Sequence, residues 1–192
     1  AAAARLAAGY ERRRYVDAPV SGSVPAVLGG TLLVMASGAA ADVDDAREVL
    51  SSFARSVLHV GDQGAGQVMK LAVNLVVHDL NAAVSEALAL AESAGVPADR
   101  AYDVLEQSVA GAPFVLYKRA AFLDPQTPVA MSLDLVAKDL RLILELAQQG
   151  GVEARATQAV LDQVQAACDD GRGGEDMAAL SRHLRPRHVS GS

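Results

Sequence analysis

The feature that most restricts the fold is a helical pattern that runs almost unbroken through more than half of the chain. Between residues 67 and 184, apolar residues recur at the spacing of one helical face, and glycine or proline interrupts them at only a few points. These interruptions divide the pattern into six segments, and Pro97 suits the first turn of its helix. We predict helices over residues 67–94, 97–111, 114–122, 131–149, 153–169 and 176–184.

The first predicted helix is unusually long. Its roughly 28 residues would extend about 42 Å at ~1.5 Å per residue, which is more than a compact domain usually needs. A helix of that length commonly bridges two domains or forms a contact between subunits. We therefore expect residues 67–184 to form an all-helical domain, and residues 185–192 to be a disordered tail.

Before residue 67 the pattern changes to short apolar runs bounded by glycine, serine and proline. Residues 15–19, 31–37 and 57–60 have the character of strands, and residues 42–54 carry apolar positions at helical spacing. A helix between the second and third strands suggests the end of an α/β sheet. The predicted fold class is mainly α, with residues 1–66 forming the end of an α/β sheet ahead of the helical domain.

No phosphate-binding turn of the dinucleotide type follows a first strand. Such a turn needs a strand, a G-x-G-x-x-G loop and a helix whose N-terminus faces the pyrophosphate. The sequence Gly64-Ala65-Gly66 comes after the third predicted strand and lacks the third glycine. We interpret it as a turn that leads into the long helix.

Composition and charge argue against several classes of protein. The apolar stretches are interrupted well before the ~20 residues that a membrane span needs, and the first residues lack the apolar core of a secretory signal. A net charge of −6 with scattered basic residues argues against nucleic-acid binding. The single cysteine, Cys168, excludes a disulfide framework and favours a reducing cytoplasm. The four histidines show no metal-ligand spacing, so we expect no metal site.

Lys70 and Asn74 form a candidate two-point polar site on the long helix. They are four residues apart, hence on one face, where both can reach the same small molecule. Their neighbours are mostly apolar, and a lysine that faces inward among them would have its pKa lowered by desolvation. Such a lysine can pass a proton near neutral pH. A surface lysine beside a hydrogen-bonded asparagine is the alternative that the residues alone leave open.

A second candidate, Ser21-Gly22-Ser23, follows a predicted strand. Its glycine lets the backbone approach a ligand closely, and its N–H groups and hydroxyls suit a carboxylate. A plain turn without a ligand is the alternative here.

Four segments occur in an order that resembles the β-hydroxyacid dehydrogenase family. They are DAPVSGS (17–23), GGTLLVMASG (29–38), GAGQVMKLAVN (64–74) and SLDLVAKDLRL (132–142). This family includes 3-hydroxyisobutyrate dehydrogenase and the glyoxylate and succinic semialdehyde reductases. The resemblance implies that residues 1–66 are the last part of a Rossmann-type dinucleotide-binding domain. It also implies that residues 67–184 are similar to the C-terminal domain of 6-phosphogluconate dehydrogenase, which binds substrate and forms the dimer.

The resemblance assigns roles to the two candidate sites. Lys70 would protonate the alkoxide that hydride transfer leaves, and Asn74 would hydrogen-bond the substrate or hold the lysine. Ser21, Gly22 and Ser23 would bind the substrate carboxylate. Relatives often have a second glycine where this chain has Ser23, a departure that affects the choice of substrate.

The resemblance also implies a cofactor, NAD or NADP, which Lys138 and Asp139 would contact from the helical side. A solvated charged pair is the alternative for these two residues. Met131 stands where relatives often have phenylalanine, so the pocket wall differs there. We expect the active site to lie between the strand part and the helical part, with the serine turn, Lys70, Asn74 and Lys138 converging.

We therefore expect an oxidoreductase that transfers a hydride between NAD(P)H and a small carboxylate-bearing aldehyde or hydroxy acid, as a homodimer or tetramer formed through the long helix. The rest of the dinucleotide-binding half is expected to be truncated or supplied by another polypeptide. One alternative is a non-catalytic helical module that dimerises. Another is an imine-reductase-like enzyme, whose proton donor is usually Asp or Tyr where this chain has Lys70.

Overall fold

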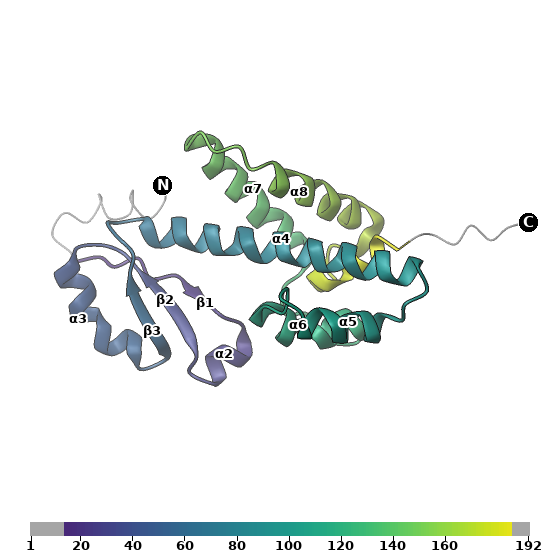
Figure 1. The fold of residues 1–192 in the computed structure, drawn as a ribbon. Coiled ribbons are helices and arrows are strands. Elements are labelled where there is room, and N and C mark those ends of the chain that lie inside the picture. The colour runs from purple at the N-terminus through teal and green to yellow at the C-terminus, as the bar shows by residue number, and fades with distance from the viewer. Residues whose placement is uncertain (1–13, 186–192) are drawn as a thin grey trace, which may run out of the picture. The chain divides into compact units, whose positions relative to one another are not determined.

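The computed structural model describes residues 14–185, which fall into two compact units (Figure 1). The first unit ends at Asn74 and the second begins at Leu75, so the division lies inside the long helix α4 (Ala65–Ser93). Most of the predicted tail, residues 186–192, lies outside the described residues. Within residues 14–185, no helix combines the length and the apolar character that a membrane span requires.

The first unit contains a three-stranded sheet in the order β1-β2-β3. Strand β2 (Leu32–Ala36) pairs in parallel with β3 (Ala54–His59) and antiparallel with the short strand β1 (Val20–Ser21). Helix α3 (Ala40–Ser51) connects the two parallel strands, because parallel neighbours require a crossover. This arrangement confirms the predicted end of an α/β sheet.

The core of the first unit is built from side chains of the sheet and of α3. Alternate residues of β2 contribute to it, since a strand turns successive side chains to opposite faces. Val43 of α3 is fully buried against them. The buried members of this core are Leu32, Val34, Ala36, Val43, Ala54 and Val57.

The first predicted strand, residues 15–19, is wrong as a continuous strand. In this run Asp17 makes an isolated bridge to Ser37, and β1 begins only after Pro19. Proline has no N–H to donate to a neighbouring strand, which explains the break in the ladder. Its carbonyl still accepts a hydrogen bond from the Met35 N–H at 2.9 Å, so the segment stays beside β2.

The long helix is confirmed, and it begins two residues before and ends one residue before the predicted bounds. The predicted helix over residues 176–184 is instead a short 3₁₀ turn followed by a single α-helical turn. After α4, the second unit contains α5 (Ala98–Gln107), α6 (Pro113–Leu123), α7 (Leu133–Gln149), α8 (Arg155–Ala167), a π-helical turn η1 (Cys168–Arg172), a 3₁₀ turn η2 (Met177–Ala179) and α9 (Leu180–His183).

The core of the second unit follows from the helical periodicity of its sequence. Helices α7 and α8 pack side by side (Figure 1). Each buries one stripe of residues spaced three or four apart, as amphipathic helices do. The buried residues of α7 are Leu133, Val136, Ala137, Leu140 and Ile143, and those of α8 are Thr157, Val160, Val164 and Ala167.

Candidate active site

Ser21, Gly22 and Ser23 form the turn between β1 and a short helix, α2 (Val24–Leu28), that was not predicted. The turn depends on Gly22. Its φ of 140° favours glycine, and a Cβ at this position would come within 2.6 Å of the Leu32 side chain. The backbone of Gly22 is exposed, so a small ligand can approach the turn at this point.

The beginning of α4 is fixed to the strand segment that leads into this turn. A Cβ on Gly66 would lie 2.5 Å from the Met35 carbonyl oxygen and 2.9 Å from Pro19 Cδ, so glycine allows the helix to start close to the sheet. The backbone N–H and the side-chain Nε2 of Gln67 donate to the buried Asp17 carboxylate at 3.2 and 2.9 Å. The predicted turn into the long helix is confirmed, and its second glycine has a packing role.

Lys70 and Asn74 lie one helical turn apart on α4, within the first unit. Both side chains are half-buried. Gln67 precedes Lys70 by three residues, so the anchor to Asp17 and the two candidate residues share one side of the helix. The predicted two-point polar site therefore lies on the side of α4 that carries the anchor.

Lys138 and Asp139 lie on α7 in the second unit. The Lys138 side chain is 61% exposed, and its Nζ is 3.4 Å from Asp139 Oδ1. The Asp139 side chain is only 15% exposed. Lys138 thus presents an accessible ammonium, whereas the carboxylate beside it is turned into the protein.

His78 was not predicted as a site residue, because the four histidines show no metal-ligand spacing. Its side chain is 1% exposed, and its Nε2 lies 3.8 Å from Asp139 Oδ2. His78 comes four residues after Asn74, which itself comes four after Lys70. The continued spacing of four was a signal in the sequence that could have found it.

A buried ion pair between Lys118 and Asp176 was also missed. Lys118 Nζ lies 2.5 and 2.7 Å from the two carboxylate oxygens, and the side chains are 4% and 7% exposed. Burial alone would raise the pKa of Asp176, but hydrogen bonds from Lys118 and from the Ala178 and Ala130 N–H groups lower it overall. The sequence separation of 58 between Lys118 and Asp176 leaves no local spacing by which the pair could have been predicted.

The segment around Asp176 also fixes the start of α7. The N–H of Leu133 donates to the Glu175 carbonyl at 3.0 Å, and that of Asp134 donates to the Gly173 carbonyl at 2.9 Å. The first N–H groups of a helix have no partner within the helix, so these bonds define where α7 begins. They therefore also set the place of Lys138, one to two turns further on.

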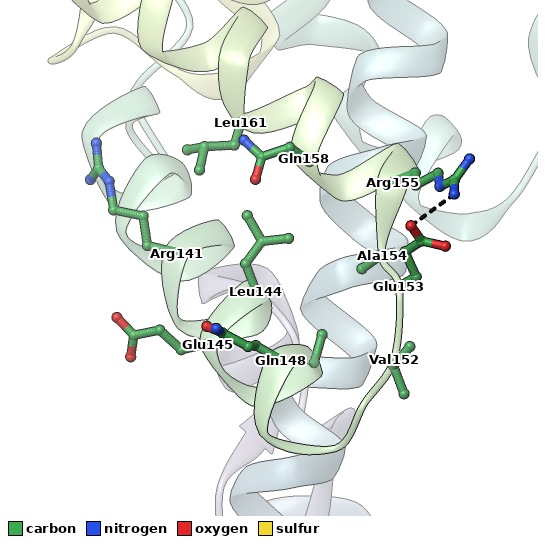
Figure 2. A pocket seen from close by; sticks show the side chains of 11 residues that line it. Arg141, Leu144, Glu145, Gln148, Val152, Glu153, Ala154, Arg155, Gln158 and Leu161 are labelled. Carbon is green, nitrogen blue, oxygen red and sulfur yellow. Dashed lines mark hydrogen bonds and ion pairs between the residues drawn. The ribbon is translucent and has the colours of Figure 1, made fainter.

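A groove of about 590 Å³ lies between α7 and α8, near the loop that joins them (Figure 2). Leu144, Val152 and Leu161 supply apolar walls, and Arg141 and Arg155 lie at its edges. Neither Lys138 nor Asp139 lines this groove. It is therefore separate from the candidate residues.

The candidate residues fall into two groups. Ser21, Gly22, Ser23, Lys70 and Asn74 belong to the first unit, and Lys138 and Asp139 belong to the second, where His78 joins them. The expected convergence of both groups on one active site stays a prediction.

Two family models match this chain. The model for the "NAD-binding of NADP-dependent 3-hydroxyisobutyrate dehydrogenase" matches residues 64–184. The model for the "NAD binding domain of 6-phosphogluconate dehydrogenase" matches residues 2–61.

Individual relatives agree with these matches. The chain is 34% identical over 179 residues to a 3-hydroxyisobutyrate dehydrogenase from Pseudomonas aeruginosa, which covers 88% of this chain and 60% of the relative. It is 32% identical over 174 residues to a 3-sulfolactaldehyde reductase from Escherichia coli, with coverages of 88% and 57%. The solved structure of a 3-hydroxyisobutyrate dehydrogenase from Salmonella typhimurium aligns with a TM-score of 0.85 and 30% identity, covering 95% of this chain and 64% of that one. The chain thus spans about 60% of the length of these relatives.

Proposed function

Because this chain belongs to the β-hydroxyacid dehydrogenase family, we propose that it carries the catalytic lysine of an NAD(P)-dependent oxidoreductase. The substrate is a small carboxylate-bearing aldehyde or the corresponding hydroxy acid. One observation carries the proposal: Lys70 and Asn74 share a side of α4 with Gln67, which is bonded to Asp17. This anchor connects the lysine-bearing helix to the strand segment that precedes the serine turn.

The serine turn is the proposed site for the substrate carboxylate. A carboxylate can accept hydrogen bonds from the hydroxyls of Ser21 and Ser23 and from the exposed backbone at Gly22. Gly22 is required by the shape of the turn itself, because its φ of 140° favours glycine and the Leu32 and Ala26 side chains fill the space that a Cβ would take.

Lys70 is the proposed proton donor. In the direction of reduction, the carbonyl oxygen becomes an alkoxide, and the Lys70 ammonium both stabilises the negative charge and gives it a proton. In the direction of oxidation, neutral Lys70 takes the proton from the substrate hydroxyl. Asn74, one turn away, donates its amide N–H to the same oxygen or holds the lysine in place.

Lys138 on α7 is the proposed contact to the nicotinamide dinucleotide. The exposed ammonium of Lys138 suits an anionic ligand, and the bonds that fix the start of α7 hold it in a defined place. When bound, the nicotinamide supplies or accepts the hydride.

We further propose that two or more copies of the chain assemble through α4 in the cytoplasm. Several apolar side chains of this helix are exposed in the single chain, which supports a covering partner. The unpaired Cys168 fits a reducing compartment. Sedimentation of the purified chain tests the assembly, and a monomer at micromolar concentration would contradict it. The exposed large apolar residues of α4 are Val68, Met69, Val76 and Leu90.

The first test is a fluorescence titration of the chain with NADH and NADPH, followed by glyoxylate, tartronate semialdehyde and succinic semialdehyde. We expect saturable binding and turnover. A folded chain that binds neither cofactor would instead favour the non-catalytic helical module. Turnover of a cyclic imine without turnover of the aldehydes would favour the imine-reductase alternative.

Substitution of Lys70 tests the mechanism itself. We expect K70A to lower turnover by about 10²- to 10⁴-fold, the usual contribution of a positioned acid or base. K70R should also be inactive, because arginine keeps its proton at every accessible pH. R155A removes an exposed cation beside the separate groove and should leave turnover unchanged. Turnover that survives K70A would remove the lysine mechanism.

A further inference from the structure

The buried ion pair of Lys118 and Asp176 joins three separate segments of the second unit. Lys118 on α6 contacts both oxygens of the Asp176 carboxylate, at 2.5 and 2.7 Å. On the side of α7, Oδ2 accepts hydrogen bonds from the N–H groups of Ala130 at 3.0 Å and Met131 at 3.4 Å. On the side of the 3₁₀ turn η2, Oδ1 accepts from the Ala178 N–H at 3.1 Å. One carboxylate thus connects α6, the segment before α7 and η2.

Stability alone does not account for this pair. The side chains of Lys118 and Asp176 are only 4% and 7% exposed. Taking two charges out of water is costly, and apolar residues of similar volume often give equal or greater stability at such a site. Fixing one arrangement of the chain is a different role that a buried pair can have.

The chemistry of the carboxylate explains why aspartate suits this position. An ionised carboxylate has two oxygens that both accept hydrogen bonds, so Asp176 serves the segment before α7 and η2 at the same time. An asparagine has a single acceptor oxygen and could serve only one of the two. Because Lys118 contacts both oxygens, it holds the carboxylate in the orientation that reaches both segments.

Hydrogen bonds continue from this carboxylate into the first turn of α7. The Met177 N–H donates to the Met131 carbonyl at 2.8 Å, and the Leu133 N–H donates to the Glu175 carbonyl at 3.0 Å. Lys138 follows on the same helix. A continuous set of contacts therefore leads from α6 to the helix that carries the exposed ammonium.

We propose that Lys118 and Asp176 are positioning residues that hold the start of α7 and, with it, the Lys138 ammonium that meets the cofactor. Without the pair, the segment before α7 separates from η2 for part of the time, and the ammonium loses its fixed place. The role at the cofactor rests on the function proposed above, whereas the connection between α6, α7 and η2 does not.

The connection is tested by amide hydrogen exchange, followed by NMR on the 192-residue chain. Ala130 and Met131 precede the helix, so their N–H groups should exchange slowly in the wild type because the buried carboxylate holds them. The variant K118M/D176N keeps the volume of the site and avoids the unpaired charge that K118M alone would leave, but its amide oxygen serves one side only. We expect exchange at these two amides and in the first turn of α7 to be at least about tenfold faster in this variant.

R119M is the matched control, because Arg119 is the next residue on α6 and pairs with Asp103 and Glu106 instead. It should leave the same amides as they are in the wild type. Rapid exchange of Ala130 and Met131 in the wild type overturns the proposal, and this result does not depend on whether the double variant folds. Unchanged exchange in the first turn of α7 in a folded double variant also overturns it.

The positioning role is tested by NADPH titration of the same variants. We expect K118M/D176N to bind NADPH about threefold to tenfold more weakly, the effect of displacing one accessible cation, and R119M to bind as the wild type does. In a K138Q background the double substitution should have no further effect, whereas a general loss of structure would weaken binding in both backgrounds.

Unchanged affinity in the double variant overturns the positioning role, as does an equal loss in the K138Q background. If the wild type itself binds no NADPH, the proposed function fails and the role at the cofactor fails with it. The exchange rates would still establish the connection between α6, α7 and η2, so the two failures can be told apart.

Discussion

Replacing Lys118 by methionine isolates the contribution of the buried ion pair with Asp176. The substitution keeps most of the volume of the side chain and removes its charge. The Asp176 carboxylate then stays buried with only backbone donors, chiefly the N–H groups of Ala130 and Ala178 at 3.0 and 3.1 Å. Removing one partner of a buried pair leaves a charge that nothing compensates, and this typically costs about 3–5 kcal/mol.

The cost is large against the ~5–15 kcal/mol by which a typical protein is stable. For a chain of this size, each kcal/mol lowers the melting temperature by roughly 2–4 °C. We therefore expect K118M to melt about 6–20 °C below the wild type at pH 7.

The dependence on pH has a definite sign. In the wild type, burial opposes ionisation of Asp176, but the hydrogen bonds of Lys118 and the backbone outweigh it, so the pKa is lowered. The stabilisation is present above the ordinary aspartate pKa of about 3.9 and is lost as the pH falls through the lower folded value. In K118M the burial dominates, so protonation relieves the penalty. The gap between wild type and variant should be widest near pH 7 and should narrow below pH ~4.

Thermal melts by circular dichroism at pH 7 and pH 3 measure both effects. The matched control is R155M, which breaks the pair between Arg155 and Glu153 at the surface (Figure 2). Their side chains are 81% and 72% exposed, so the loss should be below about 1 kcal/mol. A loss in K118M no larger than that in R155M, or a gap that widens at low pH, would refute the reasoning.

Two further predictions concern packing and burial. G66A should lose about 1–3 kcal/mol of stability, because its Cβ would lie 2.5 Å from the Met35 carbonyl oxygen. The control G174A should lose far less, because nothing lies within 4 Å of a Cβ at that position. Urea unfolding measures the free energy of unfolding of both variants. D79N should be more stable than the wild type at pH 7, since burial raises the pKa of Asp79 and so makes its ionised form unfavourable in the fold. The asparagine keeps an acceptor for the Thr157 hydroxyl. The gain in stability should vanish below pH ~3.9, where the carboxyl is protonated in the unfolded chain as well. Thermal melts that show an equal gain at pH 3 and pH 7 would contradict burial of the charge as its cause.

The helices were largely predictable because their signal is local. The apolar residues of α4 repeat at helical spacing over its whole length, and Gly95 lies just beyond the end at Ser93. The five residues of α2 (Val24–Leu28) are too few to show a period, so this helix was missed. The first strand was misplaced because the single residue Pro19 interrupts its hydrogen bonds.

The candidate site divides in the same way. Lys70 and Asn74 were predictable from a spacing of four within one helix, and His78 continues that spacing. The charged residues that lie next to the buried His78 and Lys118 were not predictable from the sequence. Asp139 lies 61 residues after His78, and Asp176 lies 58 residues after Lys118, so only the packing of separate helices brings each pair together.

The hydrogen bonds at the start of α7 also bear on how the protein is made. Residues 173–175 supply acceptors for the first turn of a helix that begins some forty residues earlier, and Leu180 is fully buried. During synthesis, α7 therefore emerges from the ribosome well before the segment that completes its beginning. The second unit can reach its native packing only after residue 180 has left the exit tunnel, and until then part of its apolar surface stays uncovered.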